Sequence, residues 1–294
     1  MKQGWLSVVV SLALLLVVAS PGCDGNGYEA GLGAFNEGNY TTALNTFRPL
    51  AEQGDAQAQF KLGVMYHQGL GVEQDDEEAV RWYRQAAEQG LASAQSNLGG
   101  MYRHGLGVSQ NDEEAMKWFR LAAEQGYAQA QYNLAGMFAE GLGVPQDFQE
   151  AFRLARLAAE QGLAIAQGQL GALYYKGQDV AQDYQEAAKW FHLAATQGNA
   201  KAQFTLGSMY YKGKGLPQDP VLAHLWLTRA AEQGFPKAVT LRETLEGVMI
   251  PEQLSEAQRL EAQGFRVREG ADSWGVSAEG LNRMESGLRW NQAV

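Results

Sequence analysis

The sequence predicts an all-α fold, a solenoid of antiparallel helix hairpins. The segment Leu62–Gly90 recurs four more times, and each recurrence starts 36 residues after the last. A fixed period of 20–50 residues is typical of repeat proteins, in which each unit packs mainly on its neighbours. Within each copy, two stretches carry apolar residues at helical spacing, with glycines between them. We therefore expect one elongated array of about seven helix pairs, five of which keep the 36-residue period.

The first helix of each unit is predicted over residues 56–67 in the first copy. Gly69 and Gly71 then end the helix, and Val72 is expected to fold back into the core. The residues spaced at i, i+4 and i+8 in this stretch form one apolar stripe, which is the pattern of a helix that packs through one face: Ala58, Leu62 and Tyr66.

The second helix of each unit opens on a capping signal. Asp75 precedes Glu78 by three residues, the spacing of a capping box in which each side chain binds the other residue's backbone N–H. The fifth copy instead carries Asp219-Pro220, with proline in the first turn, where no N–H donor is needed. Gly90 is expected to end the helix in a left-handed conformation. Its buried stripe is predicted to contain Ala79, Tyr83, Ala86 and Ala87.

A glycine recurs in the middle of the first helix, where it costs about 1 kcal/mol relative to alanine. Repetition of that cost indicates that another helix packs too closely for a side chain. The third copy keeps a small residue there, Ala135. The glycines at this position in the other copies are Gly63, Gly99, Gly171 and Gly207.

The regions outside the five copies are expected to close the array. Residues 28–53 keep the apolar phase with a shorter loop and predict an opening helix pair. Residues 235–263 predict a closing pair whose last helix begins at Pro251. The solenoid is thus expected over 28–263. Residues 264–294 lose the period and predict a flexible tail with a short helix over 281–290.

Residues 1–22 resemble a secretion signal. Lys2 precedes an uncharged run over 6–19, which is shorter than the roughly 20 residues that span a membrane. The segment before Cys23 resembles a bacterial lipoprotein cleavage site, which predicts lipid on Cys23. Ser20 stands where such signals usually carry leucine, so plain secretion or an uncleaved anchor are the alternatives. We expect an exported protein, either secreted or in the cell envelope facing the periplasm.

Composition and motifs argue against several function classes. The formal charge of −10 disfavours nucleic-acid binding, which requires clustered lysines and arginines. With a single cysteine, no intrachain disulfide can form. No SxxK, GxxxxGK[ST] or GxGxxG motif is present, and the four histidines follow no metal-site spacing. We therefore expect no enzyme activity, no cofactor and no metal, with His192 and His224 at the surface.

The repeated pattern LGxMYxxGxGVxQDxxxAxxWxxxAAEQG resembles the Sel-one-like repeat, a subclass of the tetratricopeptide superfamily, over about residues 52–234. The resemblance implies a right-handed superhelix whose first helices line a concave groove. Bacterial members are commonly scaffolds or adaptors. Cysteine-rich secreted members staple each hairpin with a disulfide. This chain lacks those cysteines, so its stability must come from packing.

The resemblance also implies where a partner binds, because ligand contacts in the superfamily come from first-helix positions beside the Leu-Gly packing pair. These positions vary between copies, as a tuned binding surface would, and as any unconstrained exposed face would. Near the C-terminal end, tyrosines and lysines, with Lys201, favour an acidic peptide or a chain terminus. The predicted partner-binding residues are Phe60, His67, Arg103, His104, Tyr132, Tyr175, Lys176, Phe204, Tyr211 and Lys212.

Together these features predict a non-enzymatic protein–protein interaction scaffold or adaptor of the bacterial envelope. It is expected to be monomeric, to bind a protein or peptide through its concave face, and to touch the membrane only through Cys23. The alternative is a carbohydrate or peptidoglycan-fragment binder. In that alternative, four tryptophans would stack on the sugar: Trp82, Trp118, Trp190 and Trp226. All four occupy the same position of the second helix, which also suits a structural role.

Overall fold

The computed structural model describes residues 26–177 and 180–262, and in this part of the chain it contains fourteen α-helices and no strand. The predicted signal segment, Cys23 and the predicted tail lie outside the described residues. The helices form the seven pairs expected from the sequence. Their bounds are α1 (Asn26–Asn36), α2 (Tyr40–Glu52), α3 (Ala56–Gln68), α4 (Asp76–Glu88), α5 (Ala92–His104), α6 (Asp112–Glu124), α7 (Ala128–Glu140), α8 (Phe148–Glu160), α9 (Ala164–Lys176), α10 (Tyr184–Thr196), α11 (Ala200–Lys212), α12 (Pro220–Glu232), α13 (Pro236–Glu246) and α14 (Pro251–Ala262).

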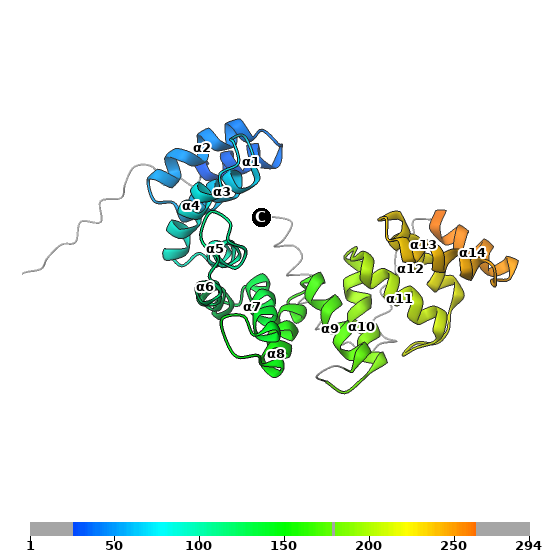
Figure 1. Ribbon diagram of the computed structural model, residues 1–294. Coiled ribbons are helices and arrows are strands. Elements are labelled where there is room, and N and C mark those ends of the chain that lie inside the picture. The colour runs from blue at the N-terminus through cyan, green and yellow to red at the C-terminus, as the bar shows by residue number, and fades with distance from the viewer. Residues whose placement is uncertain (1–25, 178–179, 263–294) are drawn as a thin grey trace, which may run out of the picture.

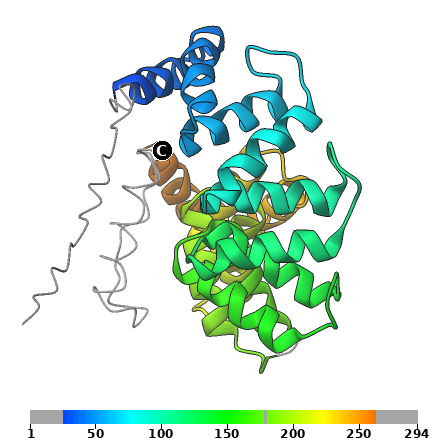
Figure 2. The same cartoon turned by 90° about the vertical axis from the view of Figure 1, so that its left-hand side faces the viewer.

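The hairpins follow one another along an arc from α1 to α14 (Figure 1). In the first half of the arc, α3, α5 and α7 lie on the inner side, and α4, α6 and α8 lie on the outer side. The view turned by 90° shows successive hairpins stacked side by side (Figure 2). Each helix makes most of its contacts with the helix before it and the helix after it. The array is therefore held together by contacts between neighbours, as expected for a solenoid.

Glycine and aspartate set the ends of the helices. The first helix of the first copy, α3, ends at Gly69, whose φ of +68° is the left-handed conformation that glycine adopts without strain. The second helix, α4, begins after Asp75, whose Oδ1 accepts a hydrogen bond from the backbone N–H of Glu78 at 2.9 Å. This half of the predicted capping box is confirmed.

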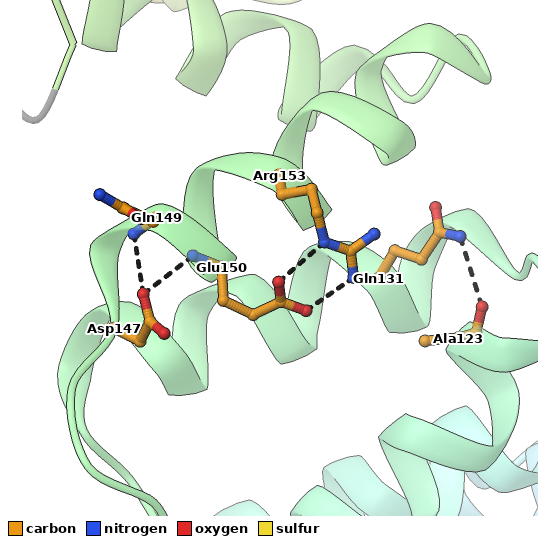
Figure 3. Close-up of polar contacts among 6 residues, drawn as sticks. All are labelled: Ala123, Gln131, Asp147, Gln149, Glu150 and Arg153. Atoms are coloured by element: carbon orange, nitrogen blue, oxygen red, sulfur yellow. Dashed lines mark hydrogen bonds and ion pairs between the residues drawn. The ribbon is translucent and has the colours of Figure 1, made fainter.

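The other half of the prediction, that Glu78 binds the backbone N–H of Asp75, is wrong. The backbone N–H of Asp75 donates to the carbonyl of Tyr66 at 3.0 Å and so joins the two helices of the hairpin. Since that N–H is already used, Glu78 pairs along its own helix, with Arg81 at 2.6 Å. Figure 3 shows the same arrangement in the third copy, where Asp147 caps the helix and Glu150 pairs with Arg153.

The mid-helix glycines mark close packing, as predicted. A Cβ added to Gly63 would lie 2.5 Å from Cδ1 of Tyr83, and one added to Gly99 would lie 2.9 Å from Cδ1 of Phe119. The contact is made within one hairpin, between the first helix and the large side chain that faces it from the second helix. Val72 packs against the core cluster of the opening pair and the first copy, as expected.

Buried glutamines join each hairpin to the one before it. Gln59 Nε2 in α3 donates to the carbonyl of Ala51 in the preceding hairpin at 3.1 Å, and its Oε1 accepts from Gln89 Nε2 at 2.7 Å. We call these residues the glutamine ladder. Figure 3 shows the bond from Gln131 to Ala123. The ladder repeats in every copy, through the pairs Gln59–Gln89, Gln95–Gln125, Gln131–Gln161, Gln167–Gln197 and Gln203–Gln233.

The ladder was not among the residues predicted from the sequence. Its signal is the presence of glutamine at the same two positions in all five copies. The first glutamine of each pair is buried, whereas the second is exposed. A buried amide without a partner costs about 1–3 kcal/mol, so the first glutamine favours only the arrangement that satisfies it. The ladder therefore fixes how each hairpin is placed on the preceding one.

Candidate partner-binding surface

All ten predicted binding residues lie on the first helices of the five copies, α3, α5, α7, α9 and α11. Residues at the same position of successive copies form a row along the array. The row that contains Phe60, Tyr132 and Phe204 is partly buried. Phe60 packs 5.9 Å from the Tyr83 ring, and Phe204 packs 5.0 Å from Phe235. These rings belong partly to the core and present only part of their surface to a partner.

The row through His67 differs from copy to copy in its contacts. His67 Nδ1 lies 2.6 Å from Oδ1 of Asp76, at the start of α4. Arg103 Nη2 lies 3.2 Å from Oε2 of Glu140, which bridges two neighbouring copies. His104 is exposed. The N-terminal half of the predicted surface is thus partly neutralised by carboxylates of the same chain.

Tyr175 and Tyr211, which are predicted partner-binding residues, also take part in the packing of the repeat. Both are half-buried against the C-terminal core cluster. The Tyr175 ring lies 5.1 Å from the Tyr184 ring, edge to face, and Lys214 Nζ lies 5.6 Å from the centre of the Tyr175 ring. The start of α10 and the loop between α11 and α12 of the next copy therefore cover part of the Tyr175 side chain.

The lysines of this end are exposed. Lys176, Lys201 and Lys212 form no ion pair with another described residue. In contrast, Lys117 and Lys189 on second helices each pair with a glutamate three residues earlier. These three lysines, which have no ion pair among the described residues, therefore all lie on first helices of the C-terminal half.

A cavity of about 680 Å³ lies between the third and fourth copies. Its walls come from α7, α8, α9, α10 and α11, and include Ala135, Ala155 and Gly168. Tyr132, Lys176 and the neighbouring Lys201 also line it. Two of the ten predicted binding residues, together with Lys201, therefore meet at one hollow. This volume is within the range of about 300–1,000 Å³ that ligand pockets occupy.

His192 and His224 are not surface residues, contrary to expectation. His224 in α12 is buried, and its two ring nitrogens lie 2.8 Å from Glu246 and 3.2 Å from Glu261. The Nε2–Glu246 hydrogen bond fastens α13 onto the array, whereas Nδ1 lies close to α14 without a hydrogen bond to it. His192 packs edge-on against Trp226, with ring centres 5.9 Å apart, and burial lowers the pKa of its imidazole.

The second-helix tryptophans serve packing. Trp226 is 1% exposed and cannot stack on a sugar. Trp82, Trp118 and Trp190 each pack against a core cluster. The indole N–H groups of Trp82 and Trp118 are buried without a hydrogen-bond partner. These contacts support the structural role over the carbohydrate-binding alternative.

Two features are absent from the described residues. No three or more His, Cys, Asp or Glu side chains in this part of the chain are grouped so that they could hold a metal ion. Among the same residues, no helix combines the length and the apolar character needed to cross a membrane.

The chain belongs to the Sel1 repeat family. The family model described as "Sel1 repeat" matches five consecutive segments, residues 56–91, 92–127, 128–163, 164–199 and 200–235. No curated protein matches the chain. The fold and the family expected from the repeated pattern are therefore confirmed.

The solved structures that are similar to this chain include two that are more than 30% identical to it. A Sel1 repeat protein from Oxalobacter formigenes is 37% identical with a TM-score of 0.71, covering 74% of this chain and 64% of the other. A protective antigen of uropathogenic Escherichia coli strains, which displays an SLR fold, is 34% identical with a TM-score of 0.67, covering 90% of this chain and 61% of the other. The chain thus spans less than two thirds of the length of either protein.

Proposed function

We propose that this chain is a non-enzymatic scaffold that binds a protein or peptide through the first helices of its C-terminal half. Sel1 repeat proteins generally mediate protein–protein interactions, and their fold is typically non-catalytic. The observation that carries the proposal is the set of exposed, unpaired lysines on first helices held in place by the glutamine ladder. A rigid frame with varied surface side chains lowers the entropic cost of binding a partner.

Charge reversal tests this face. Partners captured by the purified chain from membrane extracts are identified and then bound to Lys176→Glu with Lys212→Glu. We expect weaker binding, with a larger loss at low salt than at high salt because ions screen exposed charges. The matched control is Arg81→Glu with Arg156→Glu, which makes the same charge change on second helices. A partner that is lost from the control but not from the lysine variant would place the binding face on the second helices.

We also propose that the protein is exported to the bacterial envelope and carries lipid on Cys23. Support comes from the sequence, in which an uncharged run precedes the single cysteine. The partner would then be another envelope protein.

A further inference from the structure

We propose that the cavity between the third and fourth copies holds a large apolar side chain of the partner, with acidic residues on either side of it. This inference rests on the proposed function and names the peptide chemistry that the surface would select. The occupant is an extended peptide segment that presents a phenylalanine or a similar side chain between two carboxylates.

The cavity exists because small residues replace large ones at three repeat positions. Ala155 stands where the other second helices carry Tyr83, Phe119, Phe191 and Leu227. Gly168 stands at the first-helix position that holds Phe60, Ser96, Tyr132 and Phe204 in the other copies. Ala139 stands at the position of His67, Arg103, Tyr175 and Tyr211. All three small residues line the same cavity. In the other hairpins, the large side chain opposite the mid-helix glycine fills the corresponding space.

The rim of the cavity is apolar and exposed. Phe148 and Ile165 both line it, and they are 39% and 47% exposed. They are two of the five large hydrophobic residues that are exposed among the described residues. Burying such surface against an apolar side chain is favourable, whereas a small polar residue would leave it in contact with water.

The positive charges at the cavity favour negatively charged residues on either side of the peptide's apolar side chain. Its lining contains Lys176 and Lys201 and no aspartate or glutamate, on a chain whose net charge is −10. Lys176 is the last residue of α9, whereas Lys201 is in the first turn of α11. Because both are first helices and run in the same direction, the lysines lie toward opposite ends of the cavity. Carboxylates on both sides of the apolar side chain therefore match this arrangement.

The test uses a fluorescent, end-capped peptide with the central sequence Asp-Phe-Glu, and fluorescence anisotropy at low salt. We expect the Asn-Phe-Gln and Asp-Ala-Glu peptides to bind at least about tenfold more weakly to the purified chain, because each removes one of the two complementary features. Lys176→Gln with Lys201→Gln should weaken Asp-Phe-Glu binding severalfold and leave Asn-Phe-Gln binding unchanged. Arg81→Gln with Arg156→Gln is the matched control and should have no effect.

A variant in which the cavity is filled provides a second test. Ala135→Gly with Ala155→Phe installs in the third copy the glycine–aromatic pair that three other copies use, so the fold is expected to tolerate it. Binding of the Asp-Phe-Glu peptide should fall at least about tenfold. Should this variant lose its helical signal, a peptide with benzoylphenylalanine in place of phenylalanine is crosslinked to the unaltered chain. Crosslinks at Phe148 or Ile165 support the proposal.

Three outcomes overturn the inference. One is that the Asp-Phe-Glu peptide does not bind, or binds the filled variant as well as the unaltered chain. Another is crosslinking away from the cavity. The third is a dimer of the unaltered chain that the filled variant does not form, which would assign the cavity to a second copy. None of these affects the proposed function, which fails if captured partners tolerate Lys176→Glu with Lys212→Glu. Because Lys176 lines the cavity and Lys212 does not, Lys212→Glu alone distinguishes the two proposals.

Discussion

At the scale of single residues, the amide of Gln59 has more than one task. Its Nε2 donates to the Ala51 carbonyl and lies 3.2 Å from Gln85 Oε1, and its Oε1 accepts from Gln89. The Ala51 carbonyl is near the end of a helix, where carbonyls lack partners within the helix itself. The side chain therefore satisfies groups from two hairpins with one buried amide.

Truncating this side chain should destabilise the array. Gln59→Ala leaves the buried Ala51 carbonyl and the Gln89 amide with fewer partners, so we expect a loss of about 1–3 kcal/mol in the free energy of unfolding. Urea unfolding followed by circular dichroism measures it. Gln57→Ala, an exposed position of the same helix, should stay within about 0.5 kcal/mol of the unaltered chain. Equal effects of the two changes would contradict the role of the ladder.

The mid-helix glycines give a second prediction. Gly99→Leu should lower the free energy of unfolding by about 1–3 kcal/mol or more, since its side chain would overlap Phe119. Gly105→Ala should also destabilise, but through backbone strain, because Gly105 has a φ of +66°. Combining each change with Phe119→Ala separates the two mechanisms. The coupling should be large for Gly99→Leu and near zero for Gly105→Ala.

At the scale of elements, the bounds of the helices could be predicted well from the repeated sequence, whereas the contacts between helices could be predicted less well. Gly69 and Asp75 set their helix ends through local geometry, which spacing alone reveals. The N–H of Asp75 bonds to Tyr66 across the hairpin, and that competition is invisible in a local pattern. His224 is buried because α13 and α14 cover it, and those helices lie where the period is lost. The cavity at Ala155 could have been found by comparing second-helix rows, because its signal is a missing large side chain.

Burial of His192 predicts a pH dependence of stability. Its pKa is lowered in the folded chain by desolvation, so between the folded pKa and 6.5 the unfolded chain binds more protons. Stability from this group is therefore complete above about pH 6.5 and is lost as the pH falls toward the folded pKa. Urea midpoints at pH 7.5 and pH 5.5 should show a larger decrease for the unaltered chain than for His192→Phe. A decrease of the same size in both would count against this origin.

At the scale of the whole molecule, the fourteen helices of the described residues form one arc, in which each helix packs mainly on the helices before and after it. Such an array presents a long surface whose chemistry changes along its length. At the N-terminal end His67 and Arg103 are paired with carboxylates of the chain itself. At the C-terminal end Lys176, Lys201 and Lys212 have no such partner among the described residues. An acidic partner would therefore bind preferentially at the C-terminal end.

Export and anchoring form the prediction for the whole chain. Several acyl chains on Cys23 would anchor the protein firmly, whereas a single one binds membranes only weakly. Cys23→Ser should therefore move the protein from the membrane fraction to a soluble fraction, as measured by fractionation and immunoblotting. Mass spectrometry of the unaltered protein provides the control. Recovery of a soluble form with an unmodified Cys23 would support plain secretion instead.

The glutamine ladder also bears on how such a chain can change in length. At every junction the first glutamine of a copy donates to the carbonyl of an alanine at the same position of the preceding hairpin. One unit of 36 residues can therefore be duplicated or deleted in the gene and the new junction still pairs. Insertions of other lengths would leave buried amides unmatched. Duplication of the third and fourth units together would copy Ala139, Ala155 and Gly168, so one recombination event could repeat all three of the small residues that line the cavity.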